Sequence, residues 1–450
     1  MVDQLSDVPK VRALFRNLDK KEPAMWLLRL LRVFHIATLV LLWPAARAGD
    51  NQGGGARRLQ PGDLVYQGAF RLPDGADMAS WEWSGDALAY CPEGDPSGPD
   101  DGYPGSLFGT GHDQEQLISE ISIPVPVISK NKDVSELNTA KTLQPFRNIR
   151  GKEFEGFEMV RCGLAYLPPA PGEKSGRLHW CWGQHMQESQ FGATHGWCEL
   201  NLADPKPAGP WRIGKFQNYL TNDYLLVIPP DWAAAHTPGM PLAAGRFREG
   251  GQAAMGPSII AYRPAATRDQ PAAGSALEAL PLLQYSRVDE PPEEQRVMKG
   301  YHHSDEWADG VWLTAGRKSA VVFVGTKGQG KCWYGFANGV VWPDEPPYPP
   351  IPPAPNDDRG WWSTGFVGQM IFYDPEDLAA VAHGRRKPYE PQPYAVLDID
   401  RHLFNLTSKQ QKHHARAATF DAARGLLYVL EFRADGDKCL VHVWKVKPDA

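Results

Sequence analysis

The amino-acid sequence predicts an all-β protein, a β-propeller of about five four-stranded blades that is closed by pairing of its N- and C-terminal strands. The 450 residues include 44 Gly, 41 Pro and 16 Trp, a composition rich in turn formers and large rings. Short alternating apolar runs recur along the chain, whereas only residues 10–42 and 375–382 show helical patterns. The strand pattern also repeats weakly, as is typical of propellers.

Each repeat unit contains up to four predicted strands. An apolar strand that ends in an aromatic or bulky residue comes first, a strand led by Gly comes second, and a third alternating strand and a short fourth strand follow. The predicted first strands are residues 87–92, 162–168, 224–230, 310–316 and 416–421. The units extend over residues 87–146, 162–214, 224–286, 310–400 and 416–446.

The fifth unit has only three strands, and the missing one is available near the other end of the chain. Residues 64–72 (LVYQGAFRL) form a strand pattern that precedes the first unit. Pairing of this segment with the fifth unit closes the ring and removes exposed sheet edges. A two-sheet sandwich is the alternative fold that the same alternation allows.

The N-terminal region has the pattern of an export signal. Residues 33–43 are a mostly apolar run, too short to span a bilayer comfortably. Arg29 and Arg32 precede this run, and Ala46 and Ala48 follow it at the positions that a signal peptidase reads. We therefore expect a signal peptide over residues 1–48, a flexible linker over 49–62 and one propeller domain over 63–450. Met25 is an alternative start, and an uncleaved amphipathic anchor is the alternative interpretation.

Charge and cysteine content narrow the class of protein further. The formal net charge is −6 and there is no basic stripe, which argues against a nucleic-acid partner. Export places the protein in the periplasm or outside the cell, with no membrane span once the signal is removed. The six cysteines then permit disulfides, and at least one bridge is expected among Cys162, Cys181 and Cys198.

Several segments resemble a family of exported bacterial propeller-like proteins. They are YQGAFRLPDG, GHDQEQLISEISIP, MGPSIIAY, MIFYDPEDLAAV and PYEPQPYAVLDID, and the resemblance covers most of residues 64–446. The predicted architecture is also similar to that of five-bladed glycosidases such as arabinanases and fructosidases. The resemblance implies export and fold, and it assigns no activity.

Carboxylates lie close to the predicted starts of the innermost strands, which converge on one end of a propeller. Paired carboxylates are what glycoside hydrolysis requires, one as acid and the other as base or nucleophile. Glu158, Asp305 and Glu306 are the candidates for this pair. Solvated loop carboxylates are the alternative for each of them.

Aromatic and polar residues near these acids are candidates for holding a sugar. Trp81, Trp83 and Trp307 flank the acidic stretches and are expected to stack on sugar rings, while Asp223 and His112 are expected to bind substrate.

Histidines near the same strand starts suggest a second chemistry. A set of His, Tyr and Arg side chains, with His303 and His414 as the candidate histidines, could remove the proton next to a uronate carboxylate while Arg416 neutralises the charge, as in a polysaccharide lyase. Converging imidazoles could instead hold a divalent metal, Ca or Zn, on the propeller axis.

Two further segments near the fourth unit have predicted conformations. Residues 325–331 (GTKGQGK) resemble a phosphate-binding loop, but they lack the Ser or Thr and the following helix, so a hairpin turn is expected. Residues 342–362 form a proline-rich run that predicts a rigid flap.

Together these patterns favour a secreted or periplasmic enzyme that degrades a polysaccharide or oligosaccharide, by hydrolysis or elimination, at the centre of the propeller. A non-catalytic propeller that binds glycan or protein is the alternative from another class. A metal-dependent esterase or lactonase is the third hypothesis.

Overall fold

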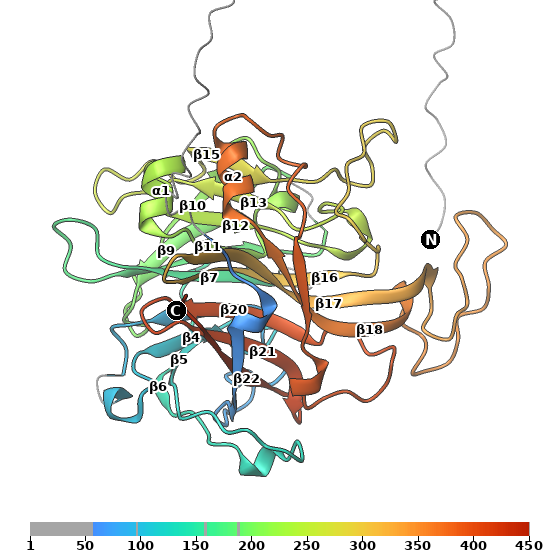
Figure 1. The fold of residues 1–450 in the computed structure, drawn as a ribbon, viewed down its shortest axis with the longest axis horizontal. Helices are drawn as coiled ribbons and strands as arrows, with labels where there is room; N and C mark the ends of the chain where they lie inside the picture. The colour runs from blue at the N-terminus through green and yellow to red at the C-terminus, as the bar shows by residue number, and fades with distance from the viewer. Residues whose placement is uncertain (1–56, 96–97, 157–159, 187–189, 450) are drawn as a thin grey trace, which may run out of the picture. The chain divides into compact units, whose positions relative to one another are not determined.

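The computed structural model describes residues 57–449 except 96–97, 157–159 and 187–189. Five antiparallel sheets, each of four main strands, form a five-bladed β-propeller (Figure 1). The predicted fold class is confirmed. The predicted signal peptide and the segment 10–42 lie outside the described residues. Among the described residues, no helix is long and apolar enough to cross a membrane.

The first four blades follow one another along the chain. Blade one contains β3 (Leu88–Cys91), β4 (Ser106–Thr110), β5 (Ile118–Ser122) and β6 (Thr142–Arg147). Blade two contains β7 (Arg161–Leu167), β8 (Arg177–Gly183), β9 (His195–Glu199) and β10 (Ala208–Ile213), with β14 (Ala276–Leu277) added to β10. Blade three contains β11 (Tyr224–Val227), β12 (Leu242–Gly245), β13 (Ile259–Tyr262) and β15 (Ala279–Leu283). Blade four contains β16 (Glu306–Ala315), β17 (Lys318–Gly335), β18 (Gly360–Tyr373) and β19 (Ala395–Asp398).

Blade five closes the ring with strands from both ends of the described chain. It contains β20 (Ala415–Asp421), β21 (Leu426–Asp435), β22 (Lys438–Val446) and β2 (Leu64–Arg71). The outermost strand β2 pairs antiparallel with β22, from Leu64 opposite Val446 to Arg71 opposite Leu440. The predicted closing segment is therefore confirmed. Short helices α1 (Pro230–His236) and α2 (Pro375–Ala382) lie beside blades three and four, and α2 matches the predicted helix.

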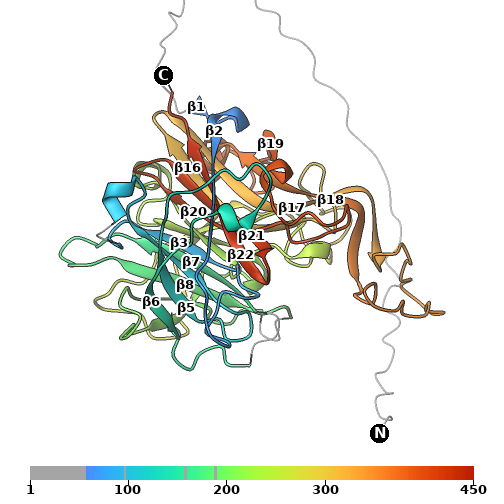
Figure 2. The same cartoon turned by 90° about the horizontal axis from the view of Figure 1, so that it is seen from below.

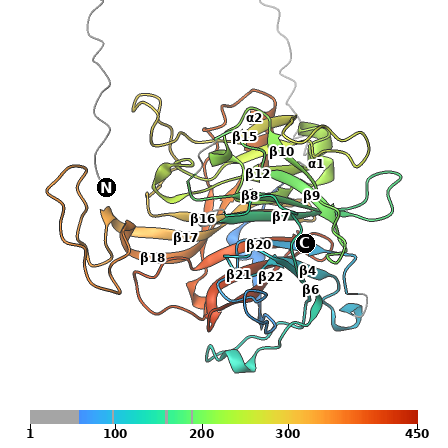
Figure 3. The same cartoon turned by 180° about the vertical axis from the view of Figure 1, so that it is seen from behind.

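The innermost strands surround the propeller axis. Each of β3, β7, β11, β16 and β20 contacts the next, and β20 contacts β3. A hydrophobic cluster fills the space between every two successive blades. Figure 3 shows blades two and three side by side, and Trp211 and Tyr262 are buried between them. Apolar residues on both faces of each blade are thus buried against the two neighbouring blades.

Glycine permits a close approach of two inner strands. A Cβ atom added to Gly163 in β7 would lie 2.7 Å from backbone atoms of Tyr224 and Leu225 in β11. We expect Gly163→Ala to lower the free energy of unfolding by about 1–3 kcal/mol, because the two backbones must move apart. Chemical denaturation measures this. Gly62→Ala is the control, since a Cβ there meets nothing within 4 Å, and an equal loss in both variants would contradict the explanation.

Blade four differs from the prediction at two places. The segment expected to be a hairpin turn, residues 325–331, continues as strand β17 and pairs with β18 as far as Gly335 opposite Gly360. These two strands project beyond the rest of their sheet, with residues 336–359 at the tip (Figures 1 and 2). Residues 57–62, expected to belong to the linker, include β1 (Arg57–Arg58), which pairs in parallel with β17.

The expected disulfide among Cys162, Cys181 and Cys198 was wrong, because all six cysteines are free thiols. Cys162 lies opposite Trp182, and Cys181 lies opposite Gly163. Since successive residues of a strand point to opposite faces, Cys181 faces blade three whereas Cys162 faces blade one. Cys198 shares the face of Cys162 but lies opposite Leu178, at the other end of the blade.

Candidate active site

A charged side chain marks the start of every innermost strand. These residues, which we call the axial cluster, are Asp86, Arg161, Asp223, Glu306 and Arg416. Each is the first or second residue of its strand or lies within two residues before it. Because the inner strands surround one axis, their starts converge at one end of it. Three carboxylates and two guanidinium groups are thereby brought together from five blades.

Asp86 connects three blades within this cluster. Its Oδ1 atom lies 2.9 Å from Nη1 of Arg416 and 3.8 Å from Nη1 of Arg161. Its Oδ2 atom accepts a hydrogen bond of 2.9 Å from the Gln116 amide. The Asp86 side chain is only 7% exposed, so its charge is stabilised by these partners rather than by water.

Glu306 is held as a carboxylate by basic side chains around it. Nδ1 of His413 lies 2.6 Å from its Oε2 atom. Burial opposes ionisation, but His413, Arg161 and Lys412 outweigh it and hold the pKa of Glu306 well below its usual range. His413 has a φ of 60°, in the left-handed region that non-glycine residues rarely adopt. Such local strain is typical of functional positions.

Glu249 is a second carboxyl group of the site, and its pKa is shifted in the opposite direction from that of Glu306. It lies just after β12, in the loop that leads to β13, and Nζ of Lys412 is 3.2 Å from its Oε2 atom. Burial and the negative charge of Glu306 raise the pKa of Glu249, although Lys412 opposes them. Its side chain remains 29% exposed. The site thus contains one carboxyl group that favours the proton and one that releases it.

Asp223 and Arg246 form the most buried ion pair of the site. Their nearest atoms are 3.6 Å apart, and both side chains are buried. Arg246 also donates to the amide oxygen of Asn222 and lies over the ring of Tyr219. Burial raises the pKa of Asp223, with Arg246 and Arg161 opposing it. Through this pair, Arg246 holds Asp223, a member of the axial cluster, in place.

The extended hairpin of blade four adds aromatic side chains beside these carboxylates. Trp333 pairs with Trp362 across β17 and β18, and Tyr334 pairs with Trp361. All four side chains are partly exposed. Nζ of Lys412 lies 4.4 Å from the centre of the Trp362 ring. The hairpin therefore borders the end of the axis at which the cluster lies.

Three of the predicted site residues, Asp223, Glu306 and Arg416, are members of the axial cluster. Glu158 lies outside the described residues. Asp305 is instead fully buried, where it binds Nζ of Lys327 at 2.8 Å and accepts backbone hydrogen bonds. Burial raises its pKa to about 6 despite Lys327. Asp305 and Glu306 are neighbours in an extended segment, so only one of them faces the axis.

The two predicted histidines have structural partners. His414 is buried, with Nδ1 at 3.0 Å from Asp400 and Nε2 at 2.8 Å from the backbone oxygen of Gln411. His303 lies between aromatic rings, 4.3 Å from Trp361 and 5.3 Å from Tyr301. His303 is partly exposed at the base of the hairpin, whereas His414 has no free nitrogen for a substrate.

The predicted sugar platforms differ in their exposure. Trp81 and Trp307 are each 1% exposed and belong to the core between blades, so neither offers a ring face. Trp83 is 39% exposed, but the guanidinium of Arg433 lies over its ring at 4.0 Å. His112 lies in the loop after β4, where Nδ1 is 3.0 Å from its neighbour Asp113.

Sequence reasoning missed Arg161, Glu249 and Lys412 as site residues. For Arg161 a signal was present, because a charged residue directly precedes or begins the apolar inner strand in all five units. Among the described residues, no group of three or more His, Cys, Asp or Glu side chains is arranged to hold a metal ion. The axial carboxylates are paired with Arg and His side chains instead.

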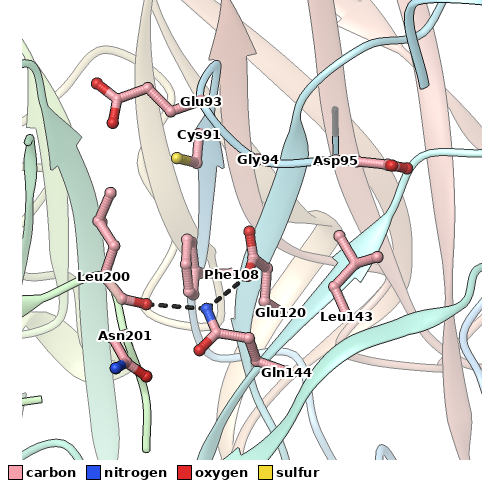
Figure 4. A pocket seen from close by; sticks show the side chains of 10 residues that line it. All are labelled: Cys91, Glu93, Gly94, Asp95, Phe108, Glu120, Leu143, Gln144, Leu200 and Asn201. Atoms are coloured by element: carbon pink, nitrogen blue, oxygen red, sulfur yellow. Dashed lines mark hydrogen bonds between the residues drawn. The ribbon is translucent and has the colours of Figure 1, made fainter. Parts of the chain in front are cut away.

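Two surface cavities lie away from the axial cluster. One, of about 400 Å³, lies between blades one and two, with Glu93, Phe108 and Leu200 in its lining (Figure 4). There the buried Glu120 accepts hydrogen bonds from Ser106 and Gln144, which satisfy its charge. The second, of about 490 Å³, lies at the outer strands of blade two, around Trp197 and Trp211. Neither cavity contains a residue of the axial cluster.

The fold and the cluster define the protein as a five-bladed β-propeller with an ion-paired charged centre. The chain matches no protein-family model, and no curated protein is similar to it in sequence. The propeller fold is compatible with both enzymes and binding proteins, so the fold alone does not assign a function.

Proposed function

We propose that the protein is an enzyme that cleaves a polysaccharide by hydrolysis at the axial cluster. The observation that carries this proposal is the pair Glu249 and Glu306, which two adjacent residues hold at the site: Lys412 lies 3.2 Å from Glu249 and His413 lies 2.6 Å from Glu306. Their surroundings displace the pKa values of the two carboxyl groups in opposite directions. Glu249 is suited to donate a proton to the glycosidic oxygen. Glu306 is suited to act as the ionised base or nucleophile, as glycoside hydrolysis requires.

The surroundings of this pair suit a sugar chain. Trp361, Trp362 and Tyr334 of the blade-four hairpin are partly exposed. His303 lies against the Trp361 ring and Lys412 against the Trp362 ring, so we expect pyranose rings to stack on the faces that these contacts leave open. These three side chains replace the buried tryptophans as the proposed sugar platforms. The export signal predicted from the sequence places the proposed enzyme in the periplasm or outside the cell, where polymeric substrates occur. The architectural similarity to five-bladed glycosidases supports the proposal by analogy only.

Elimination from a uronate is the second candidate function, favoured by the contact between His413 and Glu306. A carboxylate that accepts a hydrogen bond from imidazole orients that ring as a base. Arg161 would then neutralise the uronate carboxylate. Hydrolysis remains the leading proposal, because Glu249 and Glu306 together supply a carboxyl group that retains its proton and one that is ionised, as glycoside hydrolysis requires.

A polysaccharide panel tests the proposal and separates the alternatives. The purified protein is incubated with neutral and acidic polymers, and products are read by new reducing ends and by the ultraviolet absorbance of unsaturated uronates. Reducing ends without that absorbance support hydrolysis. Both signals together support elimination. Binding of a polymer without any product assigns the protein to the non-catalytic class and contradicts the proposal.

The proposed acid and base predict an acidic pH optimum. Activity needs Glu306 ionised, which its low pKa ensures into acidic solution, and Glu249 protonated, which is lost as pH rises through its raised pKa. Lys412→Met removes the cation that opposes this rise, so the alkaline limb of kcat/KM should move upward by about one pH unit. The exposed Lys206, paired with Asp204, is the control position. A Lys412→Met profile that stays in place or moves downward would contradict the assignment of Glu249.

A further inference from the structure

The charged groups around the axial cluster carry an excess of positive charge. The cationic side chains are Arg161, Arg246, Arg248, Lys412 and Arg416, and the anionic ones are Asp86, Asp223, Glu249 and Glu306. Five cations thus face four carboxyl groups, and one of these, Glu249, is protonated when it acts as the proposed acid. This excess of positive charge attracts an anionic sugar chain and gives no such attraction for a neutral one.

Most of these cations are already engaged. Arg416 donates to Asp86, and Arg246 donates to Asn222 and to the backbone oxygen of Gln184. Lys412 is paired with Glu249 and only 9% exposed. Arg248 donates to the backbone oxygen of His185. Each of these four side chains therefore already uses one or more of its donors on a partner within the protein.

Arg161 is different from the other four. It is the first residue of β7, and its side chain is 31% exposed. The nearest carboxylate oxygen, Oδ1 of Asp86, is 3.8 Å away, and its guanidinium donates no hydrogen bond to a described residue. The charges of Asp223 and Glu306 also act on it. Its planar fork is therefore held at the centre of the site by surrounding charge, with its donors available.

We propose that Arg161 binds the carboxylate of a uronic acid residue, so that the substrate is an anionic, uronate-containing polysaccharide. This inference rests on the proposed function, because it concerns the same site. A guanidinium offers two parallel N–H donors that match a carboxylate, which an ammonium group cannot do. Glu249 and Glu306, next to Arg161, would act on the linkage of the sugar that Arg161 holds.

Binding of matched polymers to the full chain tests the inference. Polygalacturonate is the anionic probe, and its methyl ester provides the same backbone without the charge. Calorimetric titration is performed with wild type, Arg161→Gln, Arg161→Lys and the control Arg147→Gln, an exposed position on β6. We expect Arg161→Gln to weaken binding of polygalacturonate about tenfold to a hundredfold, as for loss of hydrogen bonds to a charged group. Arg161→Lys should retain only part of the affinity, and Arg147→Gln all of it.

The outcomes separate this inference from the proposed function. Cleavage of a neutral polysaccharide that is equally fast in Arg161→Gln overturns the uronate inference and leaves the hydrolase proposal standing. Tight, Arg161-dependent binding of polygalacturonate without cleavage supports the inference and contradicts catalysis. Binding of neither polymer form overturns the inference, as does equal affinity for both forms. Thermal unfolding of each variant shows whether a loss of binding comes from the site or from the fold.

Discussion

Glu306→Gln is expected to reduce kcat about a thousandfold on any polysaccharide that the wild type cleaves, as is typical for loss of an acid–base or nucleophilic group. The substitution keeps the size of the side chain and a hydrogen-bond acceptor for His413, 2.6 Å away in the wild type. It removes the negative charge that His413, Arg161 and Lys412 stabilise. That charge would offset the positive charge that develops on the sugar in the transition state, so kcat should fall far more than KM rises.

Two comparisons make the Glu306→Gln result specific. Glu278→Gln removes a carboxylate of the same type from an exposed pair with Arg263 and should leave kcat unchanged. Because the substitution removes a carboxylate that His413, Arg161 and Lys412 stabilise, the melting temperature of Glu306→Gln should fall, and kcat is therefore compared at a temperature at which both proteins are folded. A Glu306→Gln protein that keeps kcat within about threefold of wild type would remove Glu306 from the chemistry, since acid–base groups contribute about a hundredfold or more.

The sequence predicted the propeller well because each blade is built from local apolar alternation. In blades one to three the observed strands begin within a few residues of the expected positions, for example β7 at Arg161 where 162 was expected. The extended part of β17 could not be foreseen. Residues 327–335 contain three glycines and no apolar alternation, and they are strand only because they pair with residues 360–367. Such pairing is a tertiary effect that outweighs local propensity.

The candidate site was predicted only in part, for a related reason. Glu306 and Asp223 were found because residues at the strand starts must converge. Which of several neighbouring residues faces the axis depends on the alternation of side chains along the strand. Asp305 and Trp307, on either side of Glu306, are both buried away from the axis. The contact between Glu249 and Lys412 joins residues 163 positions apart, in different blades. Such a pair comes together only when the ring closes, so no local sequence pattern predicts this contact.

Glu431→Ala is expected to lower the free energy of unfolding by about 3–5 kcal/mol, because it removes one partner of a buried, fully hydrogen-bonded network. Glu431 in β21 is 1% exposed. Its carboxylate accepts from the backbone N–H groups of Phe404 and Asn405 and lies 2.7 Å from Nε2 of His442. Nδ1 of His442 lies 2.9 Å from the hydroxyl of Tyr66, in the closing strand β2. Alanine would leave the two N–H groups and the imidazole without this partner inside the blade that closes the ring.

Guanidinium denaturation of Glu431→Ala beside Asp437→Ala measures this loss. Asp437 lies in the same blade and forms an exposed ion pair with Arg433, so its removal should cost only about 0–1 kcal/mol. Equal costs for the two variants would show that the buried network does not stabilise the closure. Tyr66→Phe tests whether the three buried residues act together. If Tyr66, His442 and Glu431 act as one unit, Tyr66→Phe should destabilise the wild type more than it destabilises Glu431→Ala, since coupled partners are not additive. The ring would then depend on a buried polar contact between its first and last strands as well as on their backbone pairing.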